Sequence, residues 1–323
     1  MTAQAHYFAG WRLRAIILSV VAAMTGYLAF SLWGGWHDVV AAFSAIGLQG
    51  TLLALGMSLL NYGLRFVRWQ LYLARLGHRL HWRPSLRIYL SGFALTTTPG
   101  KAGEAFRGVL LSKRGVPFSI SFAAFISERM SDLVAVILLT LLGMAEFPEA
   151  RSAVLLGTAG ILTVLFLISS ETALNKLLAW SNKSRRKLVT IASHIIHALH
   201  GARRCQRADL LFISTIISVI AWGAEAVAFY WVLDWLGADI SVSFAIFVYA
   251  LSMLVGALSF LPGGLGSAEA VMISLLVLKG MSTPDAIAAT VFIRLATLWF
   301  AVLIGLVALI KSRHGESLGN RTT

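Results

Sequence analysis

The stretch TTTPGKAGEAFRGVLLSKRG, residues 96–115, places a proline, glycines and charged side chains among apolar neighbours. Nearly the same pattern returns in LSFLPGGLGSAEAVMISLLVLKG, residues 258–280. Proline and glycine interrupt helices, and several of the flanking apolar segments are too short to cross a bilayer. We therefore predict two broken hairpins that re-enter the membrane. Their halves are 86–98 and 103–113 in the first hairpin, and 244–261 and 267–279 in the second.

The composition around these hairpins is that of an integral membrane protein. Hydrophobic residues make up 58% of the chain and charged residues 13%, and the mean hydropathy is +0.79. Apolar runs of about 20 residues predict about six spanning helices. These cover residues 15–33, 46–74, 118–143, 152–169, 208–236 and 284–310. We expect an all-α polytopic membrane protein with one transmembrane domain over residues 1–323, and the first run is expected to be a retained anchor.

The charge distribution predicts the orientation in the membrane. The net charge of +13 would favour nucleic acid binding in a soluble protein. Here most of the excess falls between apolar segments, where the positive-inside rule accounts for it. The basic loops at 75–87 and 171–207 are therefore expected to be cytoplasmic, with the second forming a surface elbow. Both termini would then be cytoplasmic, in a bacterial inner membrane.

The two hairpins belong to a longer internal repeat. Upstream of the hairpin turns, Gly63 matches Gly223 and Gly77 matches Gly237 at one common offset. From the turns onward, Glu104 matches Glu269 and Arg129 matches Arg294 at a slightly larger common offset, which a small insertion explains. We predict one repeat over about 46–143 and a second over about 208–310. If each hairpin re-enters from one side, the repeats have inverted topology, which is common in secondary transporters.

The ionisable residues within the apolar segments are the candidate site. Such residues are costly in a membrane and are functional candidates by default. A helix that starts near the membrane midplane also offers amide groups to an anion, as near Gly103 and Gly266, and Ser267 is a candidate N-cap. The predicted substrate-binding residues are Asn61, Arg65, Arg68, Gly100, Lys101, Gly103, Glu104, Arg107, Glu128, Arg129, Asp132, Glu225, Gly263, Gly266, Glu269 and Arg294.

Two interpretations of these charges stay open. In the first, the charges pair with one another, for example Glu104 with Arg129 and Glu269 with Arg294, and hold each hairpin to the next helix. In the second, they line a wet and mildly cationic cavity that binds substrate. Buried ion pairs are poor sources of stability, which favours the cavity. The carboxylates are also candidates for a proton relay.

Cofactor and metal chemistry are not expected. Cys205 is the only cysteine, and the sequence has no Walker motif for ATP. His194, His197 and His200 recur at three-residue spacing, but without nearby carboxylates or cysteines we interpret them as a solvated helix face.

Four segments resemble a known family. They are NYGLRFVRW (61–69), PGKAGEAFR (99–107), SERMSDL (127–133) and LPGGLGSAEA (261–270). They are similar to the transmembrane, flippase-like domain of the lysylphosphatidylglycerol synthase family, over nearly the whole chain. The resemblance implies lipid handling. In the full synthase this domain is thought to move aminoacylated phosphatidylglycerol between leaflets, and stand-alone relatives are linked to polyprenyl-phosphate sugars and other lipids.

We therefore expect a lipid flippase or scramblase that moves an anionic lipid, such as a phospholipid or a polyprenyl-phosphate-linked sugar. The phosphate is expected at the half-helix ends, with Arg129 and Arg294 nearby. No aminoacyl-transferase domain follows the last apolar segment, so we expect no enzyme activity. One alternative is a non-transporting protein that binds such a lipid and presents it to a membrane glycosyltransferase. A weaker alternative is an ion or small-solute channel.

Overall fold

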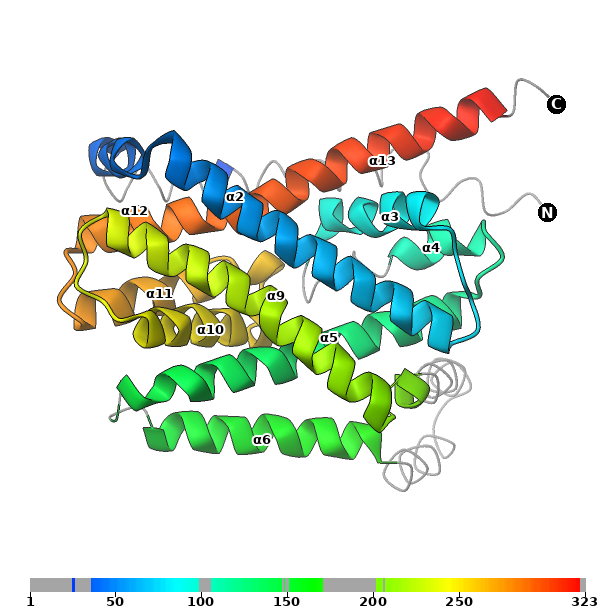
Figure 1. Cartoon of the computed structure of the whole chain (residues 1–323), viewed down its shortest axis with the longest axis horizontal. Coiled ribbons are helices and arrows are strands. Elements are labelled where there is room, and N and C mark those ends of the chain that lie inside the picture. The colour runs from blue at the N-terminus through cyan, green and yellow to red at the C-terminus, as the bar shows by residue number, and fades with distance from the viewer. Residues whose placement is uncertain are drawn as a thin grey trace.

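The structure is a computed structural model that describes residues 25–26, 36–98, 106–146, 148, 151–170, 202–205 and 207–319. The described residues form helices joined by turns (Figure 1). Three of these helices are long and apolar enough to cross a membrane, at Val39–Arg75, Ala208–Trp235 and Thr283–Lys311. The chain is therefore an all-α, multi-pass membrane protein. Nearly all of the predicted first span at 15–33, the turn at 99–105 and nearly all of the elbow at 171–207 lie outside the described residues.

The helices follow the apolar segments and end at the predicted breaks. In chain order they are α2 (Trp36–Arg75), α3 (Trp82–Ser91), η2 (Gly92–Leu95), α4 (Arg107–Ser112), α5 (Phe118–Gly143), η4 (Met144–Glu146), α6 (Arg151–Ser169), α9 (Ala208–Trp235), α10 (Val242–Leu258), η6 (Pro262–Gly264), α11 (Ser267–Leu278), α12 (Thr283–Arg294), η7 (Leu295–Trp299) and α13 (Phe300–Gly319). The predicted segment 284–310 is thus interrupted by η7, a π-helical turn in which the Phe300 amide donates to Leu295 O.

The second hairpin consists of α10, the turn η6 and α11, as predicted. One detail differs, because the N-cap of α11 is Gly266 and not Ser267. Ser267 is the first residue of the helix, and its hydroxyl lies 2.9 Å from Ser259 Oγ and 3.1 Å from Gly264 O. In the first hairpin, α3 and η2 form the incoming half, and α4 lies within the predicted outgoing half 103–113, whose first three residues are outside the described ones.

Helices α2 and α9 lie side by side and run in opposite directions across the molecule (Figure 1). Arg75 at the end of α2 pairs with Asp209 at the start of α9. Further along, Arg68 donates to Ser218 Oγ, and Asn61 Nδ2 donates to Ala221 O at 2.9 Å. As the residue number falls along α2 it rises along α9, which is the register of an antiparallel pair.

The boundaries of α2 and α9 also agree at one offset. Residue Gly47 has a φ of 65° and kinks α2, so that the straight part begins at Leu48. The offset from Leu48 to Ala208, the first residue of α9, equals the offset from Arg75 to Trp235, the last residue. It is also the offset that relates Gly63 to Gly223 in the sequence. The two helices therefore correspond from end to end.

The turns that follow matched helices have matched backbone hydrogen bonds. Gly77 has a φ of 89° and donates to Ala74 O, while Gly237 has a φ of 73° and donates to Asp234 O. At the larger offset, Gly115 donates to Ser112 O at 3.1 Å and Gly280 donates to Val277 O at 3.0 Å. All four glycines take the left-handed conformation that a side chain disfavours, which explains why the sequence repeats glycine there.

The two hairpins pack across the molecule as well as within their own halves. Helix α10 packs against α5, and α3 packs against α13. Helix α4 packs against α5, and α11 packs against α12. Elements of the first predicted repeat are thus interleaved with those of the second, and many of the buried polar residues lie where α2, α5, α9, α10 and α12 meet.

Candidate functional site

A cavity of about 300 Å³ lies at this junction. Its wall combines apolar side chains with charged ones from four helices. The charged lining residues are Arg65, Arg129, Asp132, Glu225 and Arg294. Three arginines and two carboxylates give a formal charge of 3 − 2 = +1. The cavity is therefore mildly cationic, as the second interpretation of the sequence predicted.

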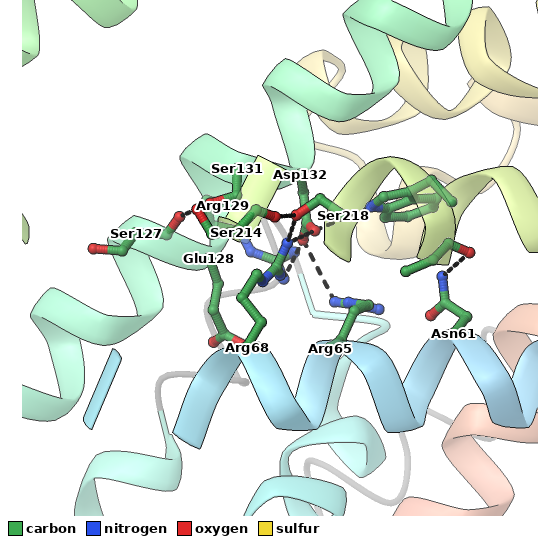
Figure 2. Close-up of polar contacts among 12 residues, drawn as sticks. Asn61, Arg65, Arg68, Ser127, Glu128, Arg129, Ser131, Asp132, Ser214 and Ser218 are labelled. Atoms are coloured by element: carbon green, nitrogen blue, oxygen red, sulfur yellow. Dashed lines mark hydrogen bonds and ion pairs between the residues drawn. The ribbon is translucent and has the colours of Figure 1, made fainter. Parts of the chain in front are cut away.

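Asp132 is at the centre of the charges in the cavity (Figure 2). Its Oδ1 accepts from Arg68 Nη1 at 2.8 Å and from the indole of Trp222 at 3.0 Å. Its Oδ2 lies 2.9 Å from Arg129 Nη2 and 3.5 Å from Arg65 Nη2. One carboxylate thus faces three guanidinium groups, and the cluster has an excess of positive charge. The pair of Arg129 with Asp132 adds to the predicted pair of Arg129 with Glu104, which stays a prediction because Glu104 lies outside the described residues.

Arg65 is held between aromatic rings as well as beside Asp132. Its guanidinium carbon lies 5.5 Å from the centre of the Trp222 ring and 5.8 Å from that of Phe93. Such contacts stabilise a cation within an apolar wall. They also fix the position of the guanidinium group, so that Arg65 faces the cavity while Arg68, one turn along α2, faces α9.

Glu225 and Tyr249 form the opposite polar part of the wall. The Tyr249 hydroxyl donates to Glu225 Oε2 at 2.6 Å. The nearby Tyr62 hydroxyl donates to Thr297 O, in the π-helical turn η7. Thr297 and Leu298 of η7 line the cavity. Single π-helical turns inside α-helices are frequent at functional sites.

Arg294 and Glu269 form the ion pair that the first interpretation predicted. Arg294 Nε donates to Glu269 Oε1 at 2.6 Å, and Arg294 Nη2 donates to Gly263 O at 2.8 Å. Glu269 Oε2 accepts from the amide of Gly266 at 2.6 Å. The Gly266 amide is therefore satisfied within the chain, and a phosphate would have to replace Glu269 to meet it.

Several predicted site residues lie beside the cavity and do not line it. Arg107 and Glu128 pair at 2.6 Å, with Arg107 over the rings of Trp69 and Tyr89. Both members are almost fully buried. Asn61, Arg68, Gly266 and Glu269 also belong to the surrounding network. Of the predicted set, the cavity brings together Arg65, Arg129, Asp132, Glu225, Gly263 and Arg294. Gly100, Lys101, Gly103 and Glu104 lie outside the described residues.

The neutral part of the wall was missed by the sequence reasoning. Its aromatic and hydroxyl side chains are Tyr62, Phe93, Thr96, Trp222, Tyr249, Phe260 and Thr297. The only available signal was spacing, because Trp222 and Glu225 are three residues apart and share a face of α9. In a chain with so many aromatic residues, that signal does not separate a cavity wall from a core.

Comparisons with known proteins agree on one family. The profile of the family described as "Lysylphosphatidylglycerol synthase TM region" matches residues 16–305. A UPF0104 membrane protein of Pyrococcus horikoshii is 25% identical over 324 residues, which cover 92% of this chain and 97% of that protein. One from Methanothermobacter thermautotrophicus is 24% identical over 92% of this chain and 93% of its own length. One from Methanocaldococcus jannaschii is 27% identical over 67% of this chain and 92% of its own length.

Proposed function

The chain belongs to the lysylphosphatidylglycerol synthase transmembrane-region family, and from this premise we propose that it moves an anionic lipid between the leaflets of a membrane. The observation that carries the proposal is the buried cationic cavity among apolar helices. On this proposal the protein is a transporter and not an enzyme, and its ligand is the phosphate-containing headgroup of a membrane lipid.

The charges of the cavity support an anionic ligand. Arginine is suited to phosphate because its planar guanidinium group donates two parallel hydrogen bonds. Arg65 and Arg129 both face Asp132 from the cavity wall, with Arg294 on the other side of the cavity. With the two lining carboxylates Asp132 and Glu225, the three arginines leave a formal charge of +1 for a phosphodiester to compensate.

We further propose that the two halves are inverted repeats. This is supported by the antiparallel pairing of α2 and α9, by the agreement of their ends at one offset, and by the repeated turns after them. Inverted repeats put the Arg79 loop and the Asp239 loop on opposite sides, and by the positive-inside rule the Arg79 loop is the cytoplasmic one. We also propose that both termini are cytoplasmic and that the membrane is the inner membrane of a bacterial cell.

Lipid exchange in liposomes tests the function. Purified protein is reconstituted with fluorescent phosphatidylglycerol, and a membrane-impermeant quencher reports how fast the inner-leaflet probe reaches the outer leaflet. We expect faster exchange than in protein-free liposomes. Arg129→Lys keeps the charge but loses the planar fork, and should slow exchange about tenfold. Arg79→Lys is the matched control, because Arg79 is exposed in a loop away from the cavity.

The outcomes separate the candidate functions. Exchange at the protein-free rate for phosphatidylglycerol and for a polyprenyl-phosphate sugar would reject transport. If the same protein nevertheless retains one of these lipids through purification, the non-transporting partner of a glycosyltransferase is favoured. Equal exchange by Arg129→Lys and the wild type would reject the role of Arg129 in the cavity.

A further inference from the structure

The entrance of the cavity differs in chemistry from its interior. Among the described residues that line the cavity, four are exposed, and these are Ala257, Leu258, Phe260 and Leu261. All four are apolar, and they follow one another closely at the end of α10 and in the turn before η6. We call residues 257–261 the rim. The charged lining residues Arg65, Asp132, Glu225 and Arg294 are buried behind it.

One residue of the rim has an unfavourable backbone conformation. Among the described residues, Phe260 is the only non-glycine residue with φ in the left-handed region, at 54°. Bulky residues rarely adopt this conformation, and glycine would do so without strain. The side chain of Phe260 is 73% exposed, so packing in the core does not offset the strain.

A hydrogen-bond network centred on Ser259 holds this conformation. Ser259 Oγ accepts from the Leu261 amide at 3.3 Å, and it donates to Gly256 O at 2.9 Å. The hydroxyl of Ser267 also lies 2.9 Å from Ser259 Oγ. Strained residues persist where the surrounding structure fixes them, and they gather at functional sites. The network therefore presents the Phe260 ring at the mouth of the cavity.

We propose that the rim is a lateral entrance for the lipid, and that the Phe260 ring contacts the acyl chain of a lipid whose phosphate headgroup is inside the cavity. This inference rests on the proposed function. A cavity of about 300 Å³ is at the lower end of the range of small-molecule sites. This size suits a headgroup, and on this proposal the acyl chains lie outside it, against the rim.

The apolar rim also distinguishes a lipid from a soluble anion. A free anion that entered over the rim would have to leave water and pass exposed apolar side chains to reach the buried Arg65 and Arg294, which is costly in a membrane. A lipid has its acyl chains in the hydrocarbon already, and only its headgroup has to move sideways. The shared chemistry of both ligands is a phosphodiester, and only the lipid has a tail for the rim to bind.

Paired substitutions test the role of Phe260. In the liposome assay, Phe260→Ala should slow exchange of phosphatidylglycerol about tenfold through loss of the aromatic contact. Phe212→Ala is the matched control, because Phe212 on α9 is 69% exposed and lies outside the cavity wall. Phe260→Gly removes the ring and the strain together. It should slow exchange equally while the protein unfolds at the same or a higher temperature, which a purely structural role for Phe260 would not produce.

Photolabelling gives a readout that does not require transport. Phosphatidylglycerol with a diazirine on its acyl chain should label residues 257–261 more strongly than the segment around Phe212. Excess lysophosphatidylglycerol should suppress this labelling, and soluble glycerophosphoglycerol should not. Suppression by the soluble headgroup alone would overturn the lateral entrance.

The two experiments distinguish a failure of the lateral entrance from a failure of the proposed transport function. If the wild type exchanges lipid and Phe260→Ala exchanges it equally fast, the entrance is overturned and the proposed function stands. If the wild type exchanges no lipid but its rim is labelled selectively, the function fails and the rim remains a binding site for lipid chains. If the wild type shows no lipid exchange and no selective labelling of the rim, the proposed function and the lateral entrance are both overturned.

Discussion

At the scale of single residues, Glu269 has two roles at once. One carboxylate oxygen accepts from Arg294 and the other accepts from the Gly266 amide. Glu269→Gln would remove the charge that compensates Arg294 in a site that is almost fully buried. Breaking a buried pair by removing one partner costs about 3–5 kcal/mol. We therefore expect a clear fall in the unfolding temperature, measured by thermal unfolding in detergent.

Asp239→Asn is the control for this substitution, because Asp239 is exposed in a loop and its neutralisation should leave the unfolding temperature unchanged. An equally stable Glu269→Gln protein would show that the pair with Arg294 contributes nothing to folding. Normal stability together with lost lipid exchange would instead assign Glu269 to the transport cycle.

Cys205 is the residue with a predicted pH dependence. It is buried just before α9, and burial raises the pKa of its thiol to about 11. The thiolate is the form that reacts with maleimides. Because the thiolate fraction rises about tenfold per pH unit below the pKa, the labelling rate should rise steeply from pH 7 to pH 10. Rapid labelling at pH 7, at the rate of a cysteine placed at the exposed Arg79, would contradict this.

The pairing of the buried charges shows what the sequence could predict at this scale. The internal repeat aligned Glu269 with Glu104. The pair of Glu269 with Arg294 belonged to one of the two interpretations of the charges, and the structure contains this pair. The pair of Arg107 with Glu128 and the three arginines around Asp132 were not predicted. Arg65 and Arg68 reach Asp132 from a helix distant in sequence, and spacing along one helix carries no information about such contacts. Arg129 and Asp132 are three residues apart on α5, so the spacing was a signal for that pair alone.

At the scale of the helices, glycines decide how closely two elements approach. Gly305 of α13 faces the first hairpin, and a Cβ on it would lie 2.2 Å from the Ala94 backbone nitrogen. Gly305→Ala must therefore separate α13 from η2, and it should lower the unfolding temperature. Overpacking of this kind typically costs about 1–3 kcal/mol. Thermal unfolding measures the change.

Gly157→Ala is the matched control for Gly305→Ala. Gly157 lies in α6, and a Cβ there would meet no atom within 4 Å. Alanine also favours a helix over glycine by about 1 kcal/mol, so this variant should be as stable as the wild type or more stable. If both substitutions change the unfolding temperature equally, then α13 and η2 are not close enough at Gly305 for an added methyl group to clash.

The helices themselves were largely predictable, because long apolar runs and Pro-Gly breaks act locally. The segments 208–236, 244–261 and 267–279 correspond to α9, α10 and α11 within a few residues. The kink in α2 and the π-helical turn η7 were less accessible. Gly47 and Leu295 are ordinary residues within apolar runs, and the kink and the π-helical turn depend on packing against other helices.

At the scale of the whole molecule, the antiparallel pairing makes a prediction about sidedness. The loops after α2 and after α9 lie at opposite ends of the pair. Single cysteines at Arg79 and Asp239, in a Cys205→Ser background, should react with an impermeant maleimide from opposite sides of the membrane. By the positive-inside rule, Arg79→Cys is expected on the cytoplasmic side.

Intact cells and inside-out vesicles provide the two accessible faces for this measurement. Asp239→Cys should be labelled in cells and Arg79→Cys in vesicles, while the Cys205→Ser protein without an added cysteine gives the background. Labelling of both positions from one face would rule out inverted repeats.

The kink at Gly47 sets the length of the straight part of α2, and this length determines the bilayer thickness that the protein fits. The straight part of α2 runs from Leu48 to Arg75, which is 75 − 48 + 1 = 28 residues, and α9 also has 28 residues. At about 1.5 Å per residue each helix is about 42 Å long, longer than the hydrocarbon core of about 30 Å and close to the full thickness with headgroups.

The Arg75–Asp209 pair at one end then lies at headgroup depth, where lipid phosphates compete for Arg75. A thinner bilayer must tilt both helices together, because they are bonded along their length at Arg68 and Asn61. Since these residues adjoin Arg65 in the cavity wall, we expect such a tilt to move the α2 and α9 sides of the cavity together relative to the other helices.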